Sequence, residues 1–132
     1  GVSRSRLQRN GKDVLARAGP DLDAARAPAI VSADAGRRVR VIGLASVTSG
    51  VPRSWRAARQ TSGVNLITDD LRETVASVLQ AIGERRSGEI VVVSIHWGGA
   101  YQAAPSARQQ AIARALSEAG ARVIAGHGPH VL

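Results

Sequence analysis

Residues 89–95 have the sequence Glu-Ile-Val-Val-Val-Ser-Ile, and His96, Trp97 and Gly98 follow them. β-Branched residues run through this segment without polar alternation, which is typical of a strand buried on both faces of a parallel sheet. A second short segment, residues 122–125, precedes the sequence Gly-His-Gly-Pro-His at 126–130. Two such strands, each followed by histidine, predict that two loops meet at the carboxyl edge of one sheet.

Helices are expected between the strands. The first helix should begin with Thr68 as its N-cap and end near Arg85. For the second helix, Ser106 and Gln109 fit a capping box and Gly120 a C-cap. The apolar residues expected on the buried face of the first helix are Leu71, Val75, Val78, Leu79 and Ile82.

Residues 39–45 are expected to form the first parallel strand, with residues 29–31 beside it in an antiparallel hairpin. Strands and helices then alternate along the chain, which predicts two linked βαβ units with right-handed crossovers. The connection 46–63 leaves the same sheet edge as the histidine segments. Its hydroxyl residues Thr48 and Ser49 either face the site or belong to an exposed loop. The sequence therefore predicts an α/β fold with a βαβαβ core of parallel strands.

The composition indicates one globular domain of 132 residues. Hydrophobic residues make up 44% of the chain, but Phe, Met and Cys are absent, so Ala, Val, Ile and Leu must build the core and no disulfide is possible. No apolar run approaches the roughly 18 residues of a transmembrane helix. The chain begins without Met and stops two residues after His130, and we expect it to be a fragment.

The formal net charge is +8, and all but one of the 18 basic residues are arginine, Lys12 being the exception. Such a charge is compatible with a nucleic-acid partner. The arginines are scattered, however, and aromatic residues, which stack on bases, make up only 2% of the chain. We therefore expect solvated arginines and no nucleic-acid partner.

His96, His127 and His130 are the three histidines of the chain, and all are expected in loops at the carboxyl edge. Neutral imidazoles gathered at one point are ordinary ligands for zinc, manganese or iron. From the residues alone, a metal or catalytic site and a hydrogen-bonded structural cluster are both open. No Gly-x-Ser-x-Gly turn, P-loop or Gly-x-Gly-x-x-Gly fingerprint is present, so nucleotide cofactors are not expected.

Val92-Val93-Ser94-Ile95-His96-Trp97-Gly98 and Gly126-His127-Gly128-Pro129-His130-Val131-Leu132 are the most specific motifs of the chain. With them, the chain resembles the capsule-synthesis CapA family of poly-γ-glutamate biosynthesis. The resemblance continues more loosely through residues 18–28 and the strand ending at 41–45. It covers residues 18–132 as a partial CapA-like domain and leaves residues 1–17 as a poorly defined N-terminal segment.

The CapA family is similar in fold to the calcineurin-like metallophosphoesterases. The resemblance thus implies a partial metallophosphoesterase-like sandwich with a divalent metal, Mn, Fe or Zn, at the strand ends. The Asp and Asn-His motifs expected near the N-terminus have no counterpart here, and Ala100 stands where the family usually has Glu. The expected site residues are His96, His127 and His130 as metal ligands and catalytic residues, with Trp97, Tyr101 and Gln102 as substrate contacts.

Two functions follow from this resemblance. The first is a metal-dependent, phosphoesterase-like hydrolase in the full-length parent, acting with the capsule-synthesis machinery on a phosphoester or related substrate. The second is a non-catalytic component that holds an anionic polymer, or an inactive truncated fragment. By resemblance, either one works in the cell envelope or outside the cytoplasm, without an anchor in this chain.

Overall fold

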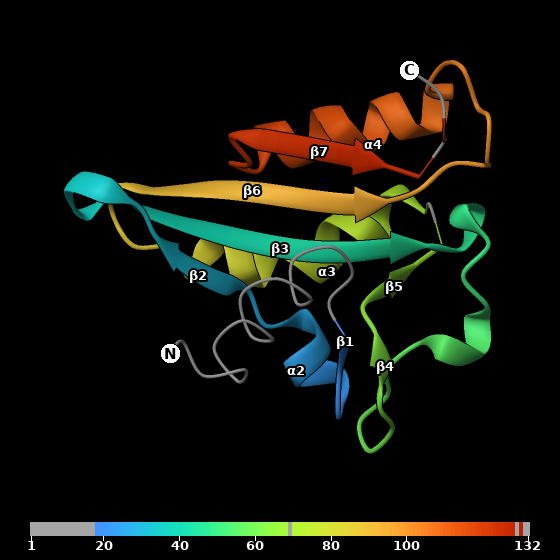
Figure 1. Ribbon diagram of the computed structural model, residues 1–132, viewed down its shortest axis with the longest axis horizontal. Helices are drawn as coiled ribbons and strands as arrows, with labels where there is room; N and C mark the ends of the chain where they lie inside the picture. The colour runs from blue at the N-terminus through green and yellow to red at the C-terminus, as the bar shows by residue number, and fades with distance from the viewer. Residues whose placement is uncertain (1–17, 69, 129, 131–132) are drawn as a thin grey trace, which may run out of the picture.

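The computed structural model describes residues 18–68, 70–128 and 130 of the chain. Its main sheet has five strands, with the order β2-β3-β6-β7 and β5 paired to the end of β3 (Figure 1). A separate ribbon of two strands is formed by β1 and β4. The strands are β1 (Ala18–Gly19), β2 (Ala29–Ser32), β3 (Arg38–Ser46), β4 (Gly63–Val64), β5 (Leu66–Ile67), β6 (Glu89–His96) and β7 (Val123–His127).

The expected βαβαβ core is present. Strands β3, β6 and β7 are parallel neighbours, and helices α3 (Leu71–Gly83) and α4 (Ala107–Glu118) connect them in turn. Both helices pack on the same face of the sheet, behind it in Figure 1. The fold is therefore a mixed α/β sheet, with β2 antiparallel to β3 as the predicted hairpin.

The main core lies between this sheet face and the two helices. It is entirely aliphatic, as the composition required, and its buried members are Ile42, Leu44, Ile67, Val78, Ala81, Ile82, Val91, Val93, Ile95, Ile112, Leu116 and Ala121. Side chains alternate across a strand, so the residues between these positions point to the opposite sheet face. On that opposite face Ile90 and Val123 are exposed.

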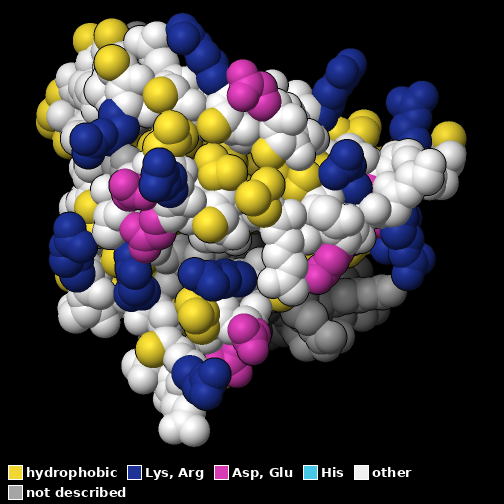
Figure 2. Space-filling view, turned by 180° about the vertical axis from the view of Figure 1, so that it is seen from behind, with side chains coloured by type: hydrophobic (Ala, Val, Ile, Leu, Met, Phe, Trp, Pro, Cys, Tyr) yellow, Lys and Arg dark blue, Asp and Glu magenta, His cyan; other side chains and the backbone are white. Residues whose placement is uncertain are grey.

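Figure 2 shows the molecule from behind, the side on which the helices lie. Arginines are spread among acidic side chains there, and none of the described histidines is visible in this view.

The start of α3 differs from the prediction. Asp70, not Thr68, is the N-cap, and its Oδ1 accepts a hydrogen bond of 2.8 Å from the Glu73 amide. Thr68 instead donates its hydroxyl to the Glu73 carboxylate. The buried stripe is also rotated, because Leu71 and Leu79 are exposed while Thr74 and Ala81 are buried beside Val78 and Ile82. The short side chains of Thr74 and Ala81 let the helix approach its neighbours closely.

The second helix begins as predicted, and its C-cap is Ala119, one residue before the predicted Gly120. Ser106 and Gln109 form the capping box at the start of α4, and Gly120 follows its end with a left-handed φ of 117°. A further helix, α2 (Leu22–Arg26), precedes the sheet, and Asp21 caps it. No helix in the described part of the chain combines the length and apolar character needed to cross a membrane.

The connection between β3 and α3 is more structured than a loop. It contains two short 3-10 turns, Val47–Ser49 and Arg53–Trp55, before β4 and β5. Strand β5 pairs in parallel with the end of β3, opposite Ala45 and Ser46. Its two residues are too few to show a periodic pattern, which is why the sequence did not predict it.

Candidate histidine site at the carboxyl edge of the sheet

His96 and His127 end the neighbouring strands β6 and β7 and are register partners in the sheet. The pairing continues one step further, because the Trp97 amide donates a 3.1 Å hydrogen bond to the His127 carbonyl. Both histidines were expected in loops, and that placement was wrong because the ladder extends to include them. The expected convergence of the two segments at one sheet edge is confirmed.

The two imidazoles meet edge to edge. Their Nδ1 atoms lie 3.1 Å apart, and the ring centroids are separated by 5.0 Å with 33° between the planes. The other ring nitrogen of His127, Nε2, lies 3.3 Å from the Ser94 hydroxyl. Both imidazoles are half-buried, on the sheet face away from α3 and α4. The arrangement is a chain of polar groups running from Ser94 through His127 to His96.

This geometry fits two ligands of one cation as well as an N–H···N hydrogen bond. Imidazole nitrogens that bind zinc at about 2.1 Å in tetrahedral or octahedral positions are roughly 3.0–3.4 Å from each other. The observed 3.1 Å between the Nδ1 atoms falls within that span. Across residues 18–68, 70–128 and 130, however, no group of three His, Cys, Asp or Glu side chains is placed to hold a metal ion. The structure thus brings two imidazoles together, and the roles of His96 and His127 as metal ligands stay predictions.

His130, the third predicted ligand, lies with Tyr101. The two ring centroids are 6.4 Å apart. Both residues have left-handed backbone conformations, with φ of 56° at His130 and 64° at Tyr101, which are uncommon for residues other than glycine. Tyr101 is 77% exposed. The role of His130 as a metal ligand stays a prediction.

Hydroxyl groups at the end of β3 and in the turn after it contact the segment that follows His96. Thr48 accepts a 3.1 Å hydrogen bond from the Gly98 amide, and its hydroxyl lies 2.8 Å from that of the fully buried Ser46. Thr48 therefore holds the segment that follows His96. Ser49 donates to the Ser46 carbonyl within its own turn.

The sequence analysis did not single out Ser46 or Ser94 as site residues. A signal for Ser94 was present in the strand pattern. It lies between two core positions of β6, and strand alternation places it on the same face as His96. Ser46 offered no comparable signal, because its role depends on how the following turn folds.

Trp97 and Gln102, predicted substrate contacts, are both engaged within the fold. The Trp97 indole packs on the core and over Gly126, where an added Cβ would lie 2.7 Å from the indole Nε1. The Gln102 amide donates to the Ala104 carbonyl at 2.6 Å and to the buried Gln109 side chain at 2.7 Å. These contacts shape the segment after His96, and the substrate roles of Trp97, Tyr101 and Gln102 stay predictions.

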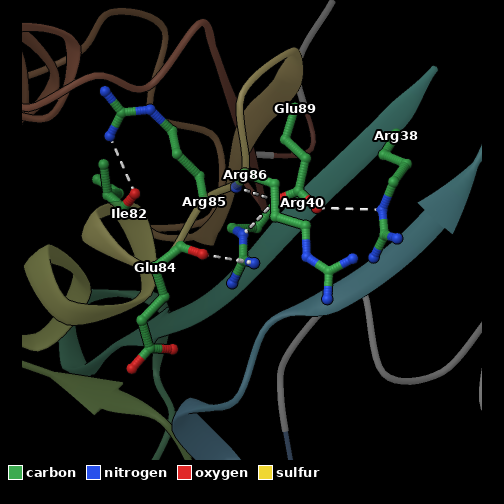
Figure 3. A network of polar contacts seen from close by, with 7 residues as sticks. All are labelled: Arg38, Arg40, Ile82, Glu84, Arg85, Arg86 and Glu89. Atoms are coloured by element: carbon green, nitrogen blue, oxygen red, sulfur yellow. Dashed lines mark hydrogen bonds and ion pairs between the residues drawn. The ribbon is translucent and has the colours of Figure 1, made fainter.

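The opposite, amino edge of the sheet carries a charged cluster (Figure 3). The Glu89 carboxylate, 1% exposed, lies 2.9 Å from Arg40 Nε and 3.1 Å from Arg38 Nε, and it accepts a 3.0 Å hydrogen bond from the Arg86 amide. Arg40 also donates to the Glu84 carbonyl at 3.1 Å. The hydrogen bond from the Arg86 amide, followed by that from Arg40, lowers the pKa of Glu89 below its ordinary value.

Other arginines are also held by intramolecular contacts. Arg85 donates to the Ile82 carbonyl at 2.9 Å (Figure 3). Arg56 pairs with Glu73 at 2.8 Å. The hydrogen bond from Thr68, together with Arg56, lowers the pKa of Glu73. Part of the positive charge of the chain is therefore used within the fold.

Comparison with known proteins places the chain in a family. The sequence profile of the family described as bacterial capsule synthesis protein PGA_cap matches residues 5–132. The chain belongs to this family. The CapA resemblance predicted from the two histidine motifs is thus confirmed.

Relatives of the chain carry names that refer to polyglutamine synthesis or to capsule or PGA biosynthesis. A probable polyglutamine synthesis accessory protein of Mycobacterium tuberculosis is 41% identical over 115 residues, which are 86% of this chain and 30% of that protein. The capsule biosynthesis protein CapA of Bacillus anthracis is 34% identical over 94 residues, 71% of this chain and 22% of that protein. The PGA biosynthesis protein CapA of Bacillus subtilis is 52% identical over 48 residues, 36% of this chain and 13% of that protein.

The chain therefore matches less than a third of the length of each of these relatives. No solved structure matches the chain.

Proposed function

We propose that this chain carries the histidine part of a divalent-metal site in a CapA-like protein of poly-glutamate capsule biosynthesis. In this proposal the site hydrolyses a phosphoester or a related bond at the cell envelope, together with the capsule-synthesis machinery. The observation that supports it is the approach of His96 Nδ1 to His127 Nδ1 at 3.1 Å, at the carboxyl ends of parallel strands. Open α/β sheets place their ligands at this edge.

His96 and His127 would hold the cation, with Mn, Fe or Zn as candidates. A divalent cation bound there would polarise a phosphoryl or acyl oxygen and lower the pKa of a water molecule. The Thr48 hydroxyl accepts a hydrogen bond from the Gly98 amide and so fixes the segment after His96. His96 is therefore positioned by this contact as well as by strand β6. The carboxylate ligands implied by the resemblance have no counterpart among the residues of this chain.

The exposed side of the site would receive the substrate. Tyr101 and His130 follow the two histidine-bearing strands in the chain, their rings lie 6.4 Å apart, and both residues are exposed. A phenol and an imidazole can donate hydrogen bonds to phosphate or carboxylate oxygens. In the proposal these two residues orient an anionic substrate beside the cation.

Calorimetric titration of the 132-residue chain with Zn²⁺ and Mn²⁺ tests the metal site. We expect one cation per chain, and we expect His127→Ala to abolish binding. Because His127 is half-buried at a strand end, the metal-free variant should lose less than about 1 kcal/mol of unfolding free energy. His130→Ala is the matched variant, and it reports whether the third histidine contributes to affinity.

Two results would contradict the proposal. One is metal binding by the wild type that His127→Ala leaves unchanged. The other is the absence of metal binding by the wild type, and a large loss of stability in the His127→Ala chain would then identify a structural histidine pair. If metal binds, a screen of chromogenic phosphoesters follows.

The net charge of +8 supports a second candidate, a non-catalytic component that holds an anionic polymer such as poly-γ-glutamate. Three of the arginines, Arg38, Arg40 and Arg56, are already paired with carboxylates. These ion pairs argue against a large free basic surface. Binding of the polymer over a series of salt concentrations separates the candidates. Binding through a diffuse charged surface should disappear at moderate salt, because ions screen exposed charges beyond about 10 Å at 0.1 M.

A further inference from the structure

Ser94 lies next to the histidine pair in a protected position. It is on β6, two residues before His96, and is only 5% exposed. Its register neighbours on the adjoining strands are Gly43 and Ala125. These small residues leave room for the His127 ring to lean back over β6, a diagonal contact that is common between neighbouring strands. The lean brings Nε2 of His127 to 3.3 Å from the Ser94 hydroxyl.

The contact with Ser94 is coupled to the contact between the histidines. A neutral imidazole has one N–H and one lone pair, so the two nitrogens of His127 must play opposite roles. If Ser94 accepts from Nε2–H, the Nδ1 of His127 carries a lone pair directed at His96. If Ser94 donates to Nε2, Nδ1 carries the hydrogen and cannot bind a cation.

We propose that Ser94 is a positioning residue that accepts a hydrogen bond from His127 Nε2–H and so holds the Nδ1 lone pair toward His96. In the metal-free protein, His96 Nδ1–H then donates to His127 Nδ1 across the observed 3.1 Å. If a cation were bound, His96 would carry its hydrogen on Nε2, and the Nδ1 lone pairs of both histidines would be available to hold the cation. Histidine ligands commonly donate their second ring N–H to such a partner, which fixes the tautomer and orientation. This inference rests on the proposed metal site for its purpose but not for its first test.

The substitutions Ser94→Thr and Ser94→Val form an isosteric pair that differs only in the hydroxyl. Both residues suit a strand, so both variants should fold, which thermal unfolding verifies. Nitrogen-15 NMR of the His127 ring in metal-free protein at about pH 8, above the ordinary histidine pKa of about 6.5, reports which ring nitrogen carries the hydrogen. We expect Nε2–H in the wild type and in Ser94→Thr, and a mixture of tautomers in Ser94→Val.

Zinc affinity measured on the same three proteins is the second readout. Loss of such a hydrogen-bonding partner typically weakens metal affinity 10- to 100-fold, so Ser94→Val should fall by roughly this factor while Ser94→Thr retains the affinity. Nδ1–H on His127 in the wild type would overturn the inference. A Ser94→Val chain with unchanged tautomer and unchanged zinc affinity would overturn it as well.

The two proposals fail in different ways. If the wild type binds no zinc, the proposed metal site is contradicted, while the NMR result still decides the role of Ser94. If zinc binds equally well to all three proteins and the His127 tautomer is also unchanged in Ser94→Val, the metal site stands and the positioning role of Ser94 is excluded.

Discussion

Strand β6 begins and ends with a polar residue, and the two ends differ in kind. At the amino edge Glu89 is almost fully buried, and its charge is compensated by Arg38 and Arg40. At the carboxyl edge His96 lies against a second imidazole, the Ser94 hydroxyl contacts His127, and the Thr48 hydroxyl accepts from the Gly98 amide. The amino end has fixed charges, and the folded chain compensates them by pairing the carboxylate with the arginines. The carboxyl end has imidazoles, whose donor and acceptor roles exchange with the tautomer.

The largest effect is expected at the amino edge. Arg40→Met keeps much of the side-chain volume but leaves the buried Glu89 carboxylate without its closest cation, and the Glu84 carbonyl loses a donor. Removing one partner of an ion pair with little solvent exposure destabilises the fold, because the remaining charge loses part of its compensation. Urea unfolding at neutral pH measures this loss.

Arg37→Met is the matched control, because Arg37 is exposed in the neighbouring turn and should change stability by about 0.5 kcal/mol or less. Equal losses of unfolding free energy in the two variants would show that the contacts of Arg40 with Glu89 and Glu84 stabilise the fold no more than an exposed arginine does. Zinc binding should be the same in both variants.

An intermediate effect is expected at the carboxyl edge from Gly128→Ala. Gly128 has a φ of 123°, and an added Cβ would lie 3.0 Å from His96 Cε1. The strained backbone and the crowded ring should together cost about 2 kcal/mol. Unlike Arg40→Met, this variant should also reduce zinc affinity, since the ring of His96 must move.

Gly83→Ala controls for the general effect of removing a glycine. An added Cβ at Gly83 meets no atom within 4 Å, and this residue ends α3. Alanine there should be neutral or stabilise the chain by up to about 1 kcal/mol. If Gly128→Ala behaves like Gly83→Ala in stability and zinc binding, the close packing around His96 is contradicted.

The smallest effect is expected for a more exposed ion pair, Arg56 with Glu73. It tests whether burial explains why the Arg40–Glu89 pair should contribute more to stability. The pKa of Glu73 is lowered from its ordinary value of 4.5 by the hydrogen bond from Thr68 and by Arg56. A lowered pKa stabilises the fold above the ordinary value, and this contribution is lost as the pH falls through the folded-state pKa. Because the carboxylate side chain is 35% exposed, Glu73→Gln should cost only about 0.5 kcal/mol at neutral pH.

That cost should disappear in acid, where Glu73 is protonated in the wild type as well. Urea unfolding at a series of pH values between about 7 and 3 measures the difference between the two chains. Glu118→Gln, on the exposed surface of α4, is the control and should show no such trend. A Glu73→Gln cost that stayed constant across the series would assign the effect to lost packing.

Local sequence signals correctly predicted the main parallel strands and the helices between them. Apolar runs located β3, β6 and β7, and the capping box at Ser106 located α4. Competing local signals were resolved differently by the fold, since Asp70 rather than Thr68 caps α3. Residues of both kinds cap helices well, and the choice depends on where the preceding β5 ends.

By itself the sequence determined the parallel βαβαβ order, the aliphatic core and the family, because these depend on periodic patterns and motifs that are local in the chain. Only the tertiary structure decided that His96 and His127 are register partners, that Ser94 lies behind His127, and that His130 lies with Tyr101. These contacts join residues up to 33 positions apart, and they depend on strand register and side-chain rotation. Local sequence patterns do not set those two quantities, whereas packing of the whole sheet does.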